Sequence, residues 1–260
     1  MARLDAFSDL ARHYDVLMAH VDYDHWFMVT RALSQMLPRP FKHLDAGSGT
    51  GILVRKLRQI GWESYGLDLS PAMIKVAKKE DPFCALCVGD MRTLPFQRCF
   101  QCVTSLFDSI NFLLTPEDVR IALEQLGSVL TGEGIVYFDI ITERMVLEHF
   151  AGQDWSENNG RFSTAWHTDY SSQTRIAETR IRVNRGPVCI VRERAYTPDQ
   201  IESLACQAGL DILGVFDAPT WRPPKRRSLR IDFVAARGAS RALRKAFRSV
   251  SADLRSCMTP

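Results

Sequence analysis

A glycine-rich turn between a short apolar segment and an amphipathic one is the feature that most limits how this chain can fold. Residues 41–57 read FKHLDAGSGTGILVRKL, with Gly47, Gly49 and Gly51 spaced two residues apart. A strand, a glycine turn and a helix in this order form the first unit of an open parallel sheet, where glycine lets a ligand approach the backbone. Packing alone gives no reason for this spacing, so we expect a ligand to contact the turn.

Strand-like and helical patterns alternate along the first half of the chain. Apolar runs that suit buried strands occupy 41–46, 63–69, 83–90, 102–108 and 134–141. Two helices are marked by a hydroxyl residue followed by proline, in SPAMIKVAKKED and TPEDVRIALEQLGSVL, because the hydroxyl caps the helix and proline suits its first position. Near-continuous apolar strands between helices predict an α/β fold with a three-layer, doubly wound and mostly parallel sheet.

The pattern changes after Thr142. The segments RFSTAWHTDY, QTRIAETRIRVN and PVCIVRERAY alternate apolar and polar residues, and the polar turns SSQ and NRG separate them. These segments predict an inserted antiparallel β ribbon of three strands with one wet face. A capped helix, TPDQIESLACQAGL, and two strand-like runs, DILGVFDA and RIDFVAA, then lead back to the core sheet.

Composition excludes several other classes of protein. The 260 residues are 46% hydrophobic and 24% charged, which suits a soluble globular protein with a sizeable core. No apolar run reaches the roughly 18 to 20 residues that span a bilayer. The N-terminus mixes both signs of charge and lacks the apolar core of a secretory signal, so we expect a cytoplasmic protein.

Seven scattered cysteines do not form a secreted disulfide framework. Cys84, Cys87, Cys99 and Cys102 form two C-x2-C pairs, a spacing that also occurs in structural zinc sites. Both pairs fall in strand-like apolar segments, where residues three apart face opposite sides of a sheet. We therefore favour buried cysteines and expect no metal.

The basic residues gather at the C-terminal end. Residues 222–260 hold 11 Lys or Arg and 2 Asp or Glu, although the whole chain carries a net charge of only +3. A helix over 240–254 places Leu243, Phe247, Val250 and Leu254 on one face. A basic amphipathic helix can bind anionic partners, so nucleic acid is possible. We favour a helix that packs on its own domain or on a second subunit, which makes a homodimer possible.

The glycine spacing separates two classes of ligand. A dinucleotide fingerprint has the form G-x-G-x-x-G, and here its third glycine is replaced by Ile52. The segment LDAGSGTG instead resembles the first motif of the class I S-adenosylmethionine-dependent methyltransferases, with Asp45, Gly47, Gly49 and Gly51 matching in position. The resemblance implies a seven-stranded, Rossmann-like sheet and S-adenosylmethionine as the cofactor.

Three more landmarks of that family follow in order. The resemblance makes Asp68, in GLDLS, the carboxylate that binds the ribose hydroxyls, with Leu69 beside it. It places Asp90 at the adenine amino group and Met91 near the ring. Phe107 and Asp108 then lie beside the methionine end of the cofactor.

The segments FSDLARHYDVLM and DSINFL resemble a subgroup that includes small-molecule N-methyltransferases, among them amino-sugar N,N-dimethyltransferases. The subgroup implies that Tyr14 lies over the sulfonium and makes Trp26 a further candidate cofactor contact. Ordinary packing is the alternative for both aromatic residues.

The predicted reaction is methyl transfer to a small-molecule acceptor, with nitrogen as the favoured target. An amine must lose a proton before it attacks, and three side chains could accept it: Asp108, His167 or Glu193. Asp108 is preferred because it follows the fourth strand, and Arg194 would suit an anionic acceptor. The sequence leaves open O- or C-methylation of a metabolite, an RNA-directed methyltransferase that uses the basic end, and a cofactor-binding protein without activity.

These inferences divide the chain into five segments. The segments are an N-terminal helical lid (1–40), a cofactor-binding Rossmann-like half (41–141), an antiparallel β insertion that caps the substrate (142–197), a return to the core sheet (198–236) and a basic amphipathic C-terminal helix (237–260).

Overall fold

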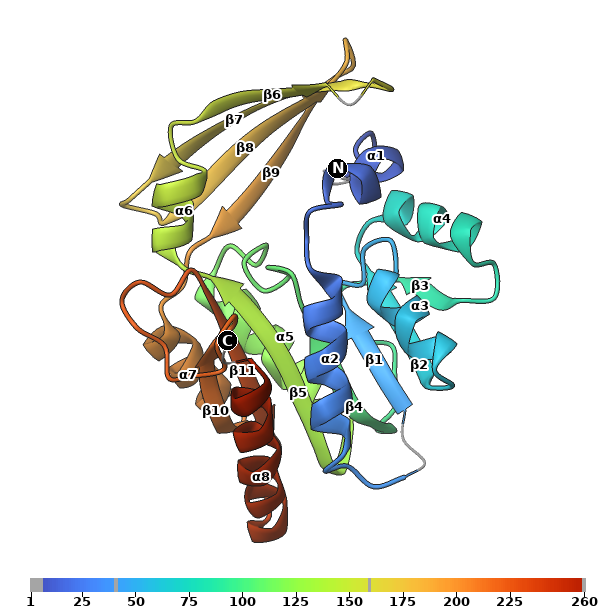
Figure 1. The fold of residues 1–260 in the computed structure, drawn as a ribbon, viewed down its shortest axis with the longest axis vertical. Helices are drawn as coiled ribbons and strands as arrows, with labels where there is room; N and C mark the ends of the chain where they lie inside the picture. The colour runs from blue at the N-terminus through green and yellow to red at the C-terminus, as the bar shows by residue number, and fades with distance from the viewer. Residues whose placement is uncertain (1–6, 40–41, 159, 259–260) are drawn as a thin grey trace.

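The computed structural model of this protein describes residues 7–39, 42–158 and 160–258, and within them seven strands form one sheet (Figure 1). The strand order is β3(Ala85–Val88), β2(Glu63–Asp68), β1(Lys42–Ala46), β4(Phe100–Ser105), β5(Leu130–Ile141), β11(Arg230–Ala236), β10(Asp211–Asp217). The first five strands are parallel, whereas β11 pairs antiparallel with both β5 and β10. The predicted seven-stranded, mostly parallel sheet is confirmed. The predicted first strand included Phe41, which lies outside the described residues.

Helices cover both faces of this sheet, which confirms the predicted three layers (Figure 1). One face carries α2(Tyr23–Ser34), α3(Ile52–Gln59), α4(Pro71–Glu80) and α8(Arg241–Cys257), and the other carries α5(Pro116–Ser128) and α7(Pro198–Gln207). The apolar face expected of the C-terminal helix is buried in α8 against the core of its own domain. No helix within the described residues is long and apolar enough to cross a bilayer.

Side-chain caps explain where several helices begin. Ser70 accepts a hydrogen bond from Met73 N, and Thr115 accepts one from Asp118 N, each at 3.1 Å. Proline follows each cap at the first helical position, as the sequence predicted. Each cap satisfies a backbone donor that a helix start would leave unpaired.

A second sheet lies beyond the carboxyl ends of the core strands (Figure 1). Its antiparallel strands, in order, are β6(Asp154–Asn158), β7(Ser163–Ser171), β8(Ile176–Val183) and β9(Val188–Arg194). The expected ribbon of three strands is wrong by one strand, because β6 has too few apolar residues to show a regular alternation. Helices α1(Ala11–Leu17) and α6(Glu143–His149) pack against this sheet. The division into five segments stays a prediction.

Asn111 joins the two sheets. Its amide nitrogen donates to the carbonyl oxygens of Ile141, at 3.2 Å, and Arg194, at 2.9 Å. Its amide oxygen accepts from Ile141 N at 3.0 Å, and its backbone oxygen accepts from Arg194 N at 2.7 Å. Asn111 is fully buried, so it fixes the end of β9 relative to the end of β5.

Replacing Asn111 with alanine therefore leaves buried backbone groups at both strand ends without partners. Each such group costs roughly 1–3 kcal/mol, so we expect Asn111→Ala to lower the free energy of unfolding in urea by at least that amount. Gln207→Ala, at an exposed position of α7, is the control and should change it by less than about 0.5 kcal/mol. Equal stability of the two variants would contradict the proposed role of Asn111.

Candidate active site

The glycine turn after β1 adopts left-handed backbone conformations. Gly47, Gly49 and Gly51 have φ of +84°, +53° and +78°. A Cβ on Gly47 would lie 2.4 Å from Ser109 Oγ, whereas one on Gly49 would meet nothing within 4 Å. The expectation that packing does not require these glycines is thus wrong for Gly47. Gly49 leaves the open space in which a ligand could approach the backbone.

Asp68 stands at the carboxyl end of β2, next to this turn. Its carboxylate accepts hydrogen bonds from Gly49 N at 2.7 Å and from Ser70 N at 2.8 Å. The following residue, Leu69, is 60% exposed although its side chain is apolar. A fixed carboxylate, an open backbone turn and an exposed apolar side chain suit a ribose and the flat base attached to it.

Asp45 is buried beneath the turn at the end of a polar chain. The ring of His43 hydrogen-bonds Ser64 Oγ at 2.8 Å and Thr104 Oγ1 at 2.9 Å, and Thr104 donates to Asp45 at 2.6 Å. Burial lowers the pKa of His43 to about 3, so its ring is neutral. Burial raises the pKa of Asp45 to about 7, with the charge of Asp68 acting in the same direction and the Thr104 hydrogen bond opposing it.

Asp90 and Met91 follow β3 on the same edge of the sheet. The carboxylate of Asp90 accepts hydrogen bonds from the backbone N and the guanidinium of Arg92. Arg92 also donates to Asp118, at 2.6 Å. Met91 approaches the glycine turn, with its Cε 3.5 Å from the position of a Cβ on Gly47. Asp90 is therefore already paired with an arginine at the place where an adenine contact was predicted.

Phe107 and Asp108 form an unusual turn after β4. Both have left-handed conformations, with φ of +55° and +64°, which cost non-glycine residues roughly 1–3 kcal/mol each. A buried ion cluster holds the turn: Arg230 pairs with both Asp108 and Asp139, and Asp108 N donates to Asp139 at 3.2 Å. The guanidinium lies 5.4 Å from the ring centroid of Trp26, which makes that tryptophan a packing partner of the cluster.

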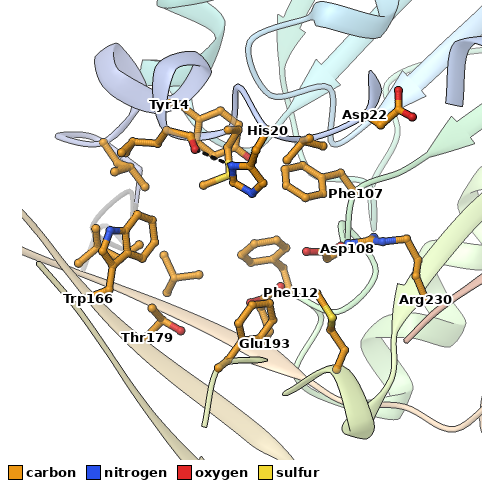
Figure 2. A pocket seen from close by; sticks show the side chains of 18 of the residues that line it. Tyr14, His20, Asp22, Phe107, Asp108, Phe112, Trp166, Thr179, Glu193 and Arg230 are labelled. Atoms are coloured by element: carbon orange, nitrogen blue, oxygen red, sulfur yellow. Dashed lines mark hydrogen bonds and ion pairs between the residues drawn. The ribbon is translucent and has the colours of Figure 1, made fainter. Parts of the chain in front are cut away.

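A cavity of about 510 Å³ opens between this turn, α1 and the second sheet. Figure 2 shows Tyr14, Phe107, Phe112 and Trp166 around its centre, with Asp108 and Glu193 on its wall. Of the predicted residues, those that line the cavity are Tyr14, Trp26, Phe107, Asp108 and Glu193, whereas the glycine turn, Asp45, Asp68, Leu69, Asp90 and Met91 lie outside it. The cavity therefore adjoins the methionine end of the predicted cofactor site.

Tyr14 lies between the glycine turn and the cavity. Burial raises its pKa well above the usual value, and the charges of Asp68, Asp108 and Glu193 raise it further. The first of these carboxylates belongs to the glycine-turn side and the other two to the cavity. Helix α1, which carries Tyr14, is tied to the turn because Thr50 donates a hydrogen bond to Asp15 at 2.5 Å.

The structure does not bring His167 together with these residues. It lies on the outer face of the second sheet, where its ring pairs with Asp154 at 2.7 Å and with Asp169 at 3.2 Å. The strand alternation decides this, since the neighbouring Trp166 points into the cavity. Arg194 is likewise turned away from the cavity and donates to Leu114 O at 3.0 Å.

Arg230 is a site residue that was not predicted from the sequence. Its partner Asp139 interrupts the near-continuous apolar strand β5 and is fully buried. A lone carboxylate in such a strand needs a cation or a hydrogen-bond donor, and this was the available signal.

The cysteines of the zinc alternative do not gather. Cys84 and Cys102 are buried and Cys87 and Cys99 partly buried, all are free thiols, and they belong to three different core clusters. Within the described ranges, no three His, Cys, Asp or Glu side chains lie close enough to share a metal ion.

The known proteins that this chain resembles are methyltransferases. A sequence profile described as "Methyltransferase domain" matches residues 44–134. The putative methyltransferase YqeM of Bacillus subtilis is 31% identical over 62% of this chain and 66% of its own length. The uncharacterized methyltransferase YrrT of the same organism is 32% identical over 53% of this chain and 67% of its own length. The putative methyltransferase GWCH70_2453 of Geobacillus is 27% identical over 88% of this chain and 98% of its own length.

A shorter match and two solved structures extend this result. The dTDP-3-amino-3,6-dideoxy-alpha-D-glucopyranose N,N-dimethyltransferase of Streptomyces fradiae is 33% identical over 38% of this chain and 39% of its own length. An S-adenosylmethionine-dependent methyltransferase from Clostridium acetobutylicum shares the fold, with a TM-score of 0.77 and 22% identity over 90% of this chain and 99% of that one. SAM-bound CalS10, an amino pentose methyltransferase from Micromonospora echinaspora, has a TM-score of 0.67 and 21% identity. The match covers 86% of this chain and 96% of that one.

Gly47 and Gly49 should differ in their tolerance of a side chain. We expect Gly49→Ala to cost about 1–2 kcal/mol of unfolding free energy, for its left-handed conformation alone. Gly47→Ala should cost more, because its methyl group also collides with Ser109. A double-mutant cycle of Gly47→Ala with Ser109→Gly, measured by urea unfolding, should recover part of that difference. Additive effects in the cycle would show that the collision does not govern Gly47.

The raised pKa of Asp45 predicts a pH-dependent stability. Because its folded-state pKa of about 7 exceeds its ordinary value of 3.8, its contribution is present in acid and lost as the pH rises through about 7. Asp45→Asn should therefore gain stability relative to the unmodified protein, by up to roughly 1.4 kcal/mol per pH unit across that window. Urea unfolding between pH 4 and pH 8 measures the difference. Asp253→Asn, at an exposed position of α8, is the control, and a difference for Asp45→Asn that is constant with pH would contradict the prediction.

Proposed function

This chain belongs to the class I S-adenosylmethionine-dependent methyltransferases, and from that premise we propose that it methylates the nitrogen of a small-molecule acceptor bound in the cavity. The observation that carries the proposal is the cavity of about 510 Å³ beside the strand ends, with the carboxyl groups of Asp108 and Glu193 on its wall. A volume of this size is typical of sites for small molecules.

The chain's own residues fit the cofactor. Asp68 would accept the ribose hydroxyls, because an ionised carboxylate is an acceptor-only group. The turn at Gly49 offers unobstructed backbone, and Leu69 offers an exposed apolar surface for the base. Tyr14 and Phe107 would meet the end of the cofactor that faces the cavity. Asp90 is paired with Arg92, so it would have to accept a hydrogen bond from the adenine amino group while it keeps or exchanges that pairing.

Methyl transfer asks the protein for alignment and for exclusion of water. When bound, S-adenosylmethionine supplies an electrophilic methyl group to the acceptor. Helix α1 and the second sheet cover the cavity, and Leu17 of α1 and Ile181 of β8 belong to the same apolar cluster, which limits the access of water. A fixed acceptor geometry of this kind is worth roughly 7–11 kcal/mol of the barrier in well-aligned systems.

Nitrogen is supported by the charges and by one relative. The cavity presents carboxyl groups, which favour an amine over an anionic acceptor. The Streptomyces fradiae relative is named as an amino-sugar N,N-dimethyltransferase, although its match covers only 38% of this chain.

The proposal is tested with S-adenosylmethionine carrying a deuterated methyl group and a panel of amines, phenols and carboxylic acids. Mass spectrometry should find the labelled methyl group on nitrogen. Label found only on oxygen or carbon would overturn the choice of nitrogen. Label found in added RNA and in no small molecule would overturn the small-molecule class.

Asp68 gives a separate test of the cofactor site. Asp68→Ala removes hydrogen bonds to a charged group, so we expect the Kd for S-adenosylmethionine to rise roughly 10- to 100-fold in calorimetry. Asp169→Ala, on the outer face of the second sheet, is the matched control and should leave the Kd unchanged. Unchanged affinity in Asp68→Ala would show that the cofactor binds elsewhere.

A further inference from the structure

Eight aromatic side chains contribute to the wall of the cavity, and most of the remaining lining residues are apolar. Tyr14, Phe107, Phe112 and Trp166 present rings to it from α1, the turn after β4 and the second sheet (Figure 2). Trp155 of the second sheet also lines it. Trp155 and Trp166 stack on each other, with ring centroids 5.3 Å apart and an interplanar angle of 6°. Such a lining favours an acceptor with an apolar, ring-bearing body, because flat apolar surfaces pack best against aromatic rings.

The charges of the cavity favour a cation. Four carboxyl residues line it, namely Asp22, Asp108, Glu157 and Glu193. Among the lining residues that the structure describes, Arg230 is the one lysine or arginine, and it already pairs with Asp108 and Asp139. A phosphate or pyrophosphate group would therefore find no uncommitted guanidinium there, whereas an ammonium group would find carboxylates.

Glu193 differs from Asp108 because the buried Oδ1 of Asp108, which also lacks a hydrogen bond, pairs with Arg230. Glu193 is a residue of the second sheet. It lies on the inner face of β9, opposite Ala177 of β8, and its side chain lines the cavity (Figure 2). Its Oε1 is buried and has no hydrogen-bond partner among the described residues. A buried carboxyl oxygen without a partner costs free energy, and this cost is relieved when a ligand supplies a donor.

Asp108 is the less suitable proton acceptor of the two. The ion pair with Arg230 compensates its charge and directs its carboxylate towards the cluster. Burial raises the pKa of Glu193 to about 8, with the charge of Asp108 acting in the same direction and Arg230 opposing it. Glu193 thus holds a proton far more readily than an ordinary glutamate.

We propose, on the basis of the function proposed above, that the acceptor is an amine on an apolar, ring-bearing body and that Glu193 is the catalytic residue that takes the proton from its nitrogen. The N–H bond of the ammonium breaks, its electron pair stays on nitrogen, and the proton forms an O–H bond on the Glu193 carboxylate. Among the mainly apolar side chains of the cavity, the neutral amine and neutral acid are favoured over the two separate charges. The nitrogen lone pair is then free to attack.

The test compares two probes of the same shape, 2-phenylethylamine and 2-phenylethanol. Their binding is measured by calorimetry with S-adenosylhomocysteine present, so that no reaction occurs. The unmodified protein should prefer the amine, and Glu193→Gln should lower that preference roughly 10- to 100-fold while leaving alcohol binding unchanged. In methylation assays the same variant should lower kcat/KM for the amine by roughly 10²- to 10⁴-fold.

Glu178→Gln is the matched control. Glu178 belongs to β8 but lies on the outer face, where it pairs with Arg180 and Arg192. It should keep both the amine preference and the rate. Glu193→Asp, which keeps the carboxyl group, should retain part of the preference, and thermal unfolding verifies that each variant is folded.

The outcomes separate the two proposals. A protein that methylates 2-phenylethylamine equally well with Glu193→Gln would overturn the role of Glu193 and leave N-methylation standing. Tighter binding of dTDP-3-amino-3,6-dideoxyglucose than of 2-phenylethylamine would overturn the apolar acceptor body. A protein that methylates no amine at all would overturn the proposed function itself.

Discussion

The buried guanidinium of Arg230 is the interaction on which the active-site edge depends. It sits between the carboxylates of Asp108 and Asp139 and against the rings of Trp26 and Phe107. Without it, two carboxylates would be buried without a counter-charge, at a cost of several kcal/mol. The same cluster holds Phe107 and Asp108 in left-handed conformations that neither residue favours alone. The strained turn is therefore a consequence of the ion cluster.

The second constraint is the attachment of the second sheet and α1, which cover the cavity, to the core sheet. Asn111 fixes the end of β9 to the end of β5, and Thr50 fixes α1 to the glycine turn. Both attachments use hydrogen bonds to fixed partners, so Glu193 and Tyr14 reach the cavity from separate elements with defined positions. The short stretch from Phe107 to Asn111 thus takes part in both constraints. Its first two residues contact Arg230 in the ion cluster, and its last residue, Asn111, links the two sheets.

Local patterns predicted much of the fold. Hydroxyl caps followed by proline marked the starts of α4 and α5, and the structure shows the capping hydrogen bonds. Period-two alternation found β7, β8 and β9, and it also placed Glu193 on a definite face once the sheet was known. It failed for β6, whose sequence DWSEN has one apolar residue. Alternation also did not decide on which face of the sheet His167 lies. It assigns residues to two opposite faces but does not tell which face lines the cavity.

The sequence by itself determined the α/β class, the glycine turn and the residues at the ends of the first four strands, because these depend on backbone preferences and on neighbours along the chain. The tertiary structure alone decided that a side chain at Gly47 would collide with Ser109 and that Arg230 compensates the charge of Asp108. Each of these contacts joins residues from separate segments or depends on how side chains share the same space. The physical reason is that burial and charge compensation are properties of the packed molecule, and no segment carries them alone.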